Sequence, residues 1–323
     1  MRRNVHQLLS RNAIVFVLIG LCILFGALNP AFFSVTNLFN VLRQVAVVGI
    51  VAVGMTFVML TGGIDLSVGA IIGVSAVVAA KAMLAGMNPV LASLMTITIG
   101  LLLGILNGVF VNELRIPPLV ATLGAMTAWR GVAFMVTGGL PVFGFSTTFR
   151  SLGQGYVWII PIPVLIAAAV FIVGHIVLSN TRFGRYVYGV GSNEEATRLS
   201  GINVRAVKYA VYSISGTLSA LAGLVMLSRI NSGQPRAGAG YEIDVVTAVV
   251  LGGVSIAGGV GKISLVVIGV LIMGVLSNGM IMINIDEYVQ GTVKGLVLIA
   301  SVGAESVISY RRTKRRPKLS QTN

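Results

Sequence analysis

Thr181–Lys208, with the sequence TRFGRYVYGVGSNEEATRLSGINVRAVK, is a polar stretch in the middle of a chain whose neighbouring segments are long and apolar. The stretch carries five basic and two acidic residues: Arg182, Arg185, Arg198, Arg205, Lys208, Glu194 and Glu195. Charges of this density are too costly to bury in a bilayer, whereas the apolar segments on either side could cross one. The stretch therefore predicts a loop at a membrane surface, with membrane-spanning helices before and after it.

Within this stretch, residues 193–201 (NEEATRLSG) predict a short helix. Asn193 suits the N-cap, because its side-chain oxygen can accept a hydrogen bond from a free N–H of the first turn. Glu194 and Glu195 follow where the positive end of the helix dipole favours acids, and Gly201 supplies a stop. A short charged helix between membrane spans is a natural contact for a partner protein in the cytoplasm.

Composition places the chain among integral membrane proteins. Its 323 residues are 56% hydrophobic and 10% charged, whereas soluble domains carry about 25% charged residues. The net charge of +14 does not indicate nucleic-acid binding, because the basic residues gather in loops and tails between apolar spans. His6 and His175 have no Cys or acid at ligand spacing, and no group of side chains indicates catalysis, so we expect no metal, cofactor or catalytic residue in this chain.

Hydropathy predicts an all-α polytopic membrane protein with about ten transmembrane helices, in one domain over residues 1–323. The predicted spans are 13–28, 45–60, a third that follows Asp65 and ends at 84, 89–111, 118–137, 157–178, 209–227, 243–257, 263–283 and 289–310. With the amino terminus inside, the cytoplasmic segments hold sixteen basic residues and the outer loops hold four: Arg43, Arg150, Arg229 and Arg236. The positive-inside rule therefore predicts both termini in the cytoplasm, with the 179–208 loop and a basic tail, 311–323.

Polar residues inside the spans are candidates for a gate or a substrate path. Asp65 directly follows two glycines and leaves two interpretations open, an N-cap of the third span or a contact with substrate or gate. Asn107 and Asn278 could bind hydroxyls, although hydrogen bonds between helices are the expected role. Arg130 also belongs to this candidate set. We expect it and Lys294 to extend to a membrane interface.

Three further patterns concern how the helices begin and pack. Glu242 and Asp244 stand at the start of the eighth span, where the helix dipole favours acids. A glycine recurs at every fourth position at 100, 104 and 108, and such a stripe predicts the close approach of a second helix. Residues 52–74 also align with residues 248–270, which suggests an internal repeat.

The chain resembles the permease subunits of bacterial sugar ABC importers, and in particular the ribose permease group. The resemblance is carried by AVGMT (52–56), TGGIDLSVG (61–69), ATL (121–123), RG (130–131), TRFGR (181–185), GSNEEATRLSGI (191–202) and VVLGG (249–253). It covers nearly the whole chain, and the longer runs are specific. The EAA-x-x-x-G loop of the family maps onto Glu195, Ala196 and Gly201, with Thr197 in place of the second alanine.

This resemblance implies a fold like that of type II ABC importers, in the cytoplasmic membrane of a bacterium. The implied partners are a second copy of the chain, a cytoplasmic ATP-binding protein, usually with two fused nucleotide-binding domains, and a periplasmic or lipid-anchored sugar-binding protein. ATP would be bound and hydrolysed by the partner, so the chain itself is expected to be no enzyme. The residues that would couple it to the ATPase are Asn193, Glu194, Glu195, Ala196, Arg198 and Gly201.

Two of the outer arginines, Arg229 and Arg236, are candidates for docking the sugar-binding protein. Arg229 and Arg236 flank a polar stretch, 231–235, which we expect to be flexible, and contact with lipid headgroups is the alternative role. An ion-coupled sugar transporter is the alternative function, although such carriers are expected to place acids deep in several spans. A membrane-bound enzyme is a third interpretation. The sequence leaves the identity of the sugar open.

Overall fold

The computed structural model describes residues 13–314, which are mostly helical. The helices are α2 (Ala13–Leu28), η1 (Pro30–Phe33), α3 (Val35–Leu60), α4 (Val68–Leu84), α5 (Pro89–Asn112), α6 (Pro118–Thr137), α7 (Thr147–Gln154), α8 (Ile162–Asn180), α9 (Arg182–Ser192), α10 (Glu194–Leu199), α11 (Val204–Ile230), α12 (Tyr241–Leu251), α13 (Ile263–Met282) and α14 (Glu287–Lys314). Strands β1 (Tyr156–Val157) and β2 (Ile160–Pro161) pair in a short antiparallel hairpin. Two groups of basic residues that the topology predicts in the cytoplasm lie outside the described residues, namely those before Ala13 and those of the tail beyond Lys314.

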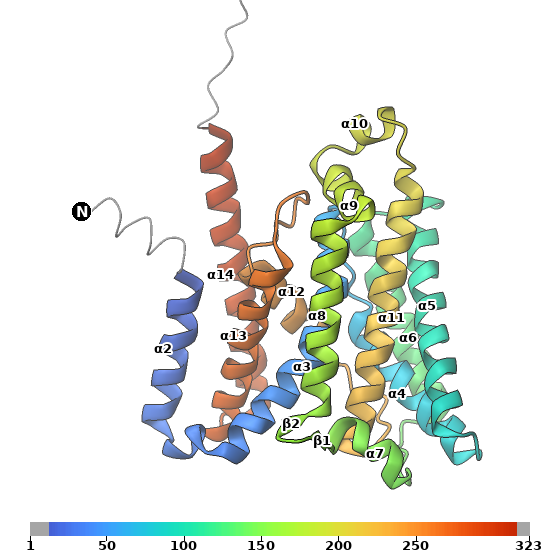
Figure 1. Cartoon of the computed structure of the whole chain (residues 1–323), viewed down its shortest axis with the longest axis vertical. Coiled ribbons are helices and arrows are strands. Elements are labelled where there is room, and N and C mark those ends of the chain that lie inside the picture. The colour runs from blue at the N-terminus through green and yellow to red at the C-terminus, as the bar shows by residue number, and fades with distance from the viewer. Residues whose placement is uncertain (1–12, 315–323) are drawn as a thin grey trace, which may run out of the picture.

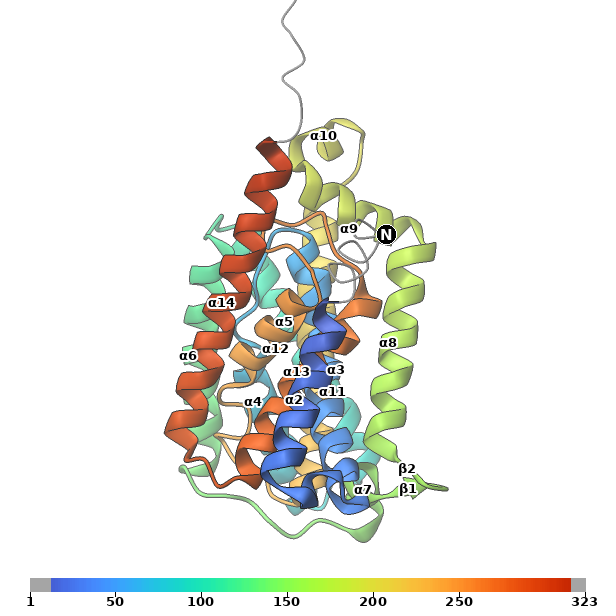
Figure 2. The ribbon, with the colours of Figure 1, turned by 90° about the vertical axis from the view of Figure 1, so that its left-hand side faces the viewer.

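The long helices run roughly along one common axis (Figure 1). The helices α9 and α10 and the carboxyl end of α14 lie at one end of the molecule, here called the α10 end, and α7 and the β hairpin lie at the hairpin end (Figures 1 and 2). Six described helices are long and apolar enough to cross a membrane, namely α3, α5, α6, α8, α11 and α13, and α2 and α4 are shorter apolar helices. The prediction of a helical, polytopic membrane protein is confirmed.

Helix α11 lies at the centre of the fold and packs against α3, α4 and α5. The glycine stripe of α5 makes the closest of these contacts, because a methyl group at Gly100 would lie 2.6 Å from the carbonyl oxygen of Gly216 on α11. One turn later, a methyl group at Gly104 would overlap the backbone of Tyr212. The close helix approach predicted from this stripe is therefore confirmed.

Several predicted boundaries differ from those of the helices, two of them by six residues or more. The second span begins at Val35 rather than at residue 45, because the Ser34 side chain caps α3 by accepting a hydrogen bond from Asn37 N at 3.3 Å. The eighth span ends at Leu251 rather than at residue 257, because Gly252 and Gly253 follow and Gly253 has a φ of +79°. The resulting α12 has 11 residues and is only about 16 Å long, too short to cross a hydrocarbon core of about 30 Å.

Two breaks in the helices meet near the α10 end. Residues 61–67 separate α3 from α4, and residues 252–262 separate α12 from α13. Gly259 N in the second break donates a hydrogen bond to the Leu60 carbonyl oxygen at the first, at 2.9 Å. The two segments of the suggested repeat therefore share a helix–break–helix pattern, and their glycine pairs lie next to each other.

Residues 231–240, which include the stretch 231–235 that was expected to be flexible, pack along α4. The loop contacts Ala80 through Gly233, Gly73 through Pro235, and Gly69, the second residue of α4, through Gly238. Because α4 is 17 residues long, or about 25 Å, these contacts carry the loop from the hairpin end deep into the molecule. Helix α12 therefore starts in the interior.

Candidate functional site

The polar stretch forms three structural pieces at the α10 end: α9, α10 and the start of α11. Asn193 caps α10, because its Oδ1 accepts a hydrogen bond from Ala196 N at 2.9 Å. Glu194 and Glu195 occupy the first turn, and Gly201 follows the helix with a φ of +81°. The predicted short helix, its cap and its stop are confirmed. Helix α9, which sequence analysis did not predict, is capped by Thr181, whose Oγ1 accepts from Gly184 N at 3.2 Å.

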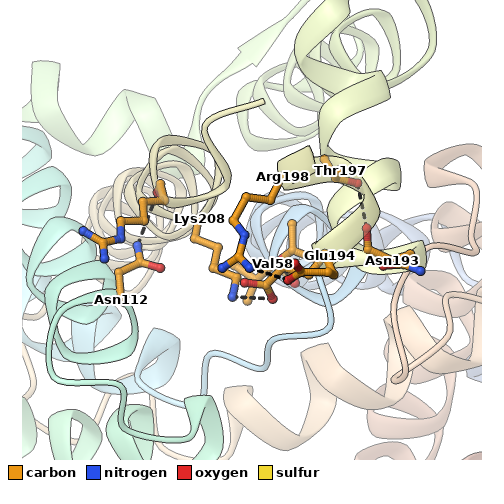
Figure 3. Close-up of polar contacts among 10 residues, drawn as sticks. Val58, Asn112, Asn193, Glu194, Thr197, Arg198 and Lys208 are labelled. Carbon is orange, nitrogen blue, oxygen red and sulfur yellow. Dashed lines mark hydrogen bonds and ion pairs between the residues drawn. The ribbon is translucent and has the colours of Figure 1, made fainter. Parts of the chain in front are cut away.

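Ion pairs orient α10 against its neighbours. Arg198 pairs with Glu195 along the helix at 2.6 Å, and Lys208 of α11 pairs with Glu194 at 2.8 Å. Figure 3 shows Arg198, Glu194 and Lys208 converging below α10. Exposed pairs of this kind contribute about 0–1 kcal/mol to stability, so their main effect is on the position of α10 and the charge of its surface.

The outward surface of α10 combines charge with one large apolar side chain. Leu199, at the end of the helix, is 78% exposed. Thr197 faces the opposite way and is buried over Gly189 of α9, and its Oγ1 donates to the Asn193 carbonyl oxygen at 2.8 Å. The departure from the family's second alanine is thus accommodated. A cavity of about 510 Å³, bordered by Glu194, Arg198 and the loop between α5 and α6, lies beside the helix.

Helix α9 contacts both helix breaks. A methyl group at Gly191 would overlap the Leu60 carbonyl oxygen and lie 2.5 Å from Gly259 N. The Tyr188 hydroxyl donates to the Gly261 carbonyl oxygen at 2.9 Å, and burial raises the pKa of this phenol, so it stays a donor at neutral pH. Helix α9 therefore connects α10 to both breaks.

Asp65, in the first break, is completely buried. Its Oδ1 accepts from Ser67 N at 3.1 Å, Ser67 Oγ at 2.6 Å and Asn107 Nδ2 at 3.3 Å, and its Oδ2 accepts from Ser215 Oγ at 2.7 Å. The N-cap interpretation is wrong, because Ser67 occupies the cap position of α4. Asp65 instead joins the first break to α5 and α11, and the interhelical role expected for Asn107 is confirmed.

Arg130 and Lys294 make ion pairs with the start of α12. Arg130 of α6 lies 3.3 Å from Glu242, and Lys294 of α14 lies 2.7 Å from Asp244. The expectation that these cations extend to a membrane interface is wrong, because the loop at 231–240 brings the two acids within their reach. The signal for this pairing was present in the sequence, as two acids and two cations within apolar segments favour mutual pairing.

Asn278 lies apart from these residues. It exchanges two hydrogen bonds of 2.9 Å with Asn37 at the start of α3, an interhelical role that the sequence predicted. The candidate path residues are therefore not one cluster. Asp65 and Asn107 meet, Arg130 joins α12, and Asn278 links α13 to α3.

The outer arginines also separate. Arg229, at the end of α11, borders a cavity of about 530 Å³ together with Arg43 of α3 and Gln154 of α7. Arg43 lies over the Tyr156 ring of the hairpin, 4.7 Å from its centroid. Arg236 lies instead over Phe134 of α6, at 5.8 Å. Sequence reasoning grouped Arg229 with Arg236 by proximity in the chain, and missed Arg43 because that neighbour is distant in sequence.

Comparison with known proteins gives concordant matches along the chain. Residues 37–302 match the family described as "Branched-chain amino acid transport system / permease component". The chain is 44% identical to the ribose import permease protein of Bacillus subtilis, over 87% of this chain and 88% of that one. It is 36% identical to the D-allose permease protein of Escherichia coli, over 91% of each chain, and 35% identical to the xylose permease protein of the same species, over 95% and 94%. No solved structure matches.

Proposed function

Because the chain belongs to the permease family that its residues 37–302 match, and to the group of the ribose import permeases, we propose that it is the membrane-spanning subunit of an ABC importer for a monosaccharide. The observation that carries this proposal is the connection from α10 through α9 to both helix breaks. An exposed helix tip joined to the interior is what a subunit driven by a separate ATPase requires. Ribose is the first candidate, since the ribose import permeases share 44% identity with this chain.

The chain crosses the cytoplasmic membrane ten times in this proposal, with the α10 end inside. Helices occupy all ten predicted span ranges, although α12 completes its crossing only together with the loop at 231–240. Arg115, the basic residues of α9–α11 and Lys262 belong to the segments that the topology puts inside, while Arg43, Arg150 and Arg229 belong to those outside. The positive-inside rule supports this orientation.

The proposed partner at the α10 end is a cytoplasmic ATP-binding protein with two nucleotide-binding domains, one for each copy of the permease. Leu199 supplies an apolar anchor, and Glu194, Glu195 and Arg198 supply charges that set orientation. A second copy of the chain completes the membrane part. Closure of the nucleotide-binding domains moves α10, and α9 passes this motion to the residues around Leu60 and Gly259.

At the hairpin end, the proposed partner is the extracytoplasmic sugar-binding protein. Arg43 and Arg229 share the wall of one cavity, so two guanidinium groups border it. Carboxylates of a binding protein are suitable partners for such groups. Arg236 is a separate candidate contact, next to α6.

Reconstitution tests this function directly. The chain, its ATP-binding partner and its sugar-binding protein are placed in liposomes, and uptake of labelled ribose, allose and xylose is followed. We expect uptake to require the binding protein and hydrolysable ATP and to survive an uncoupler. Uptake that follows a proton or sodium gradient without ATP would contradict the proposal.

A further inference from the structure

The start of α12 borders a cavity of about 250 Å³ whose lining mixes polar and apolar groups. Its wall includes amides and a hydroxyl from three other helices, an ion pair and an aromatic ring: Gln44, Ser277, Gln290, Asp244, Lys294 and Tyr241. Pockets for drug-sized ligands measure roughly 300–1,000 Å³. This cavity therefore suits a smaller molecule, and its wall suits one with both polar groups and apolar surface.

The ion pair in this wall is not fully hydrogen-bonded. Asp244 Oδ2 accepts from Lys294 Nζ at 2.7 Å, whereas the buried Oδ1 has no hydrogen-bond partner within residues 13–314. The ammonium group has three N–H donors, and among the described residues only Asp244 uses one. A buried polar atom without a partner costs about 1–3 kcal/mol, so a ligand that donates and accepts hydrogen bonds here would be favoured.

The chemistry of the wall selects a neutral polyhydroxyl compound. Asp244 and Lys294 cancel each other's charge, and Glu287 adds one exposed acid to the wall, so an anionic ligand is disfavoured there. Hydroxyl groups both donate and accept, which matches a carboxylate, an ammonium group and two amides at once. The Tyr241 ring offers an apolar surface to the C–H face of a sugar ring. Resting on the proposed function, we propose that this cavity is a transit site for the transported monosaccharide.

The outer cavity and this site share one polar wall residue. Gln44 borders both cavities, and Asn40, one turn earlier on α3, borders the outer one with Arg43 and Arg229. A sugar that is released at the hairpin end thus meets hydrogen-bonding groups along one face of α3. A site on a transport route must bind weakly enough to release its ligand, and we expect half-occupancy at millimolar sugar.

Cysteine protection tests the site in the complete transporter. In a Cys22→Ser background, Gln290→Cys and Gln44→Cys place one thiol in each of two facing walls, and Thr148→Cys on exposed α7 serves as the control. Each variant in liposomes is treated with a small membrane-impermeant thiosulfonate, with and without ribose and without binding protein. We expect ribose to slow labelling of both cavity thiols several-fold in the millimolar range, and to leave Thr148→Cys unaffected.

Uptake measured on the same samples separates this inference from the proposed function. Normal ATP-dependent uptake with ribose-independent labelling of both cavity thiols would overturn the transit site and leave the permease function standing. Absence of labelling at both positions would also overturn it, since a transit site must hold water. Protection at both walls, with none at Thr148→Cys, supports it.

Discussion

At the scale of single residues, the fold satisfies one buried acid with neutral donors. Asp65 accepts four hydrogen bonds, of which three come from side chains: Ser67, Asn107 and Ser215. These hydrogen bonds fix the position of the first break relative to helices α5 and α11. A carboxylate bound in this way ties three elements together, which a simple helix cap would not do.

Removal of the Asp65 side chain should destabilise the protein. Asp65→Ala leaves buried hydroxyl and amide groups unpartnered, at about 1–3 kcal/mol for each. Asp65→Asn keeps one acceptor oxygen, and Ser215 can reorient to accept from the new amide, so its loss should be smaller. Thermal unfolding in detergent measures both, with Glu195→Ala, an exposed acid, as the control. Equal stability of Asp65→Ala and the unaltered protein would show that these hydrogen bonds contribute little to stability.

At the scale of elements, α10 is the piece whose surface matters more than its stability. Exchanging its internal ion pair, with Glu195→Lys and Arg198→Glu, keeps two opposite charges three residues apart and reverses them on the exposed face. We expect the double variant to insert normally but to separate ATP hydrolysis from uptake. The sugar taken up per ATP hydrolysed should fall by roughly 5- to 150-fold, the usual range of coupling between two sites. ATPase activity and sugar uptake are measured in the same liposomes.

The control for this exchange is Glu195→Gln with Arg198→Gln, which removes the charges without reversing them. Its effect should be smaller than that of the exchanged pair. Unchanged uptake per ATP in the exchanged variant would remove α10 from the coupling role.

Helix α9 gives a second prediction at the same scale. Gly191→Ala introduces a methyl group that overlaps the Leu60 carbonyl oxygen, and overpacking of this kind costs about 1–3 kcal/mol. We expect reduced uptake with ATPase activity retained, because the contact between α9 and the breaks is altered while the outward surface of α10 is not. Gly124→Ala on α6 is the matched control, since its methyl group would meet no atom within 4 Å. Similar uptake by both variants would argue against transmission through α9.

At the scale of the whole molecule, the proposed function gives the two ends different partners, and the hairpin end should bind through charge. Arg43→Glu with Arg229→Glu places acids where the binding protein is expected to present carboxylates. Juxtaposed like charges cost several kcal/mol, so the half-saturating concentration of binding protein should rise at least about tenfold, the change for 1.4 kcal/mol. Binding-protein-stimulated ATPase activity measures it at low salt, and basal activity should persist.

Two comparisons sharpen this experiment. Added salt should weaken stimulation of the unaltered protein, because exposed charges are screened. Arg236→Glu tests the other arginine, which lies over Phe134 apart from the shared cavity, and its effect should be smaller. If the half-saturating concentration of binding protein is unchanged in the double variant at low salt, Arg43 and Arg229 do not dock the binding protein. Contact with lipid headgroups would then be their role.

The sequence by itself determined the class of protein, the approximate positions of the helices, the short helix 194–199 with its Asn193 cap, and the glycine contact between α5 and α11. These features depend on hydropathy, on local hydrogen bonds and on periodic spacing, which neighbouring residues specify. Only the tertiary structure decided that Asp65 accepts hydrogen bonds from α5 and α11, that Arg130 and Lys294 pair with α12, and that Arg43 joins Arg229. Each of these contacts joins residues more than 40 positions apart, and the inward course of the 231–240 loop depends on glycines of α4, so chain folding rather than local pattern brings the partners together.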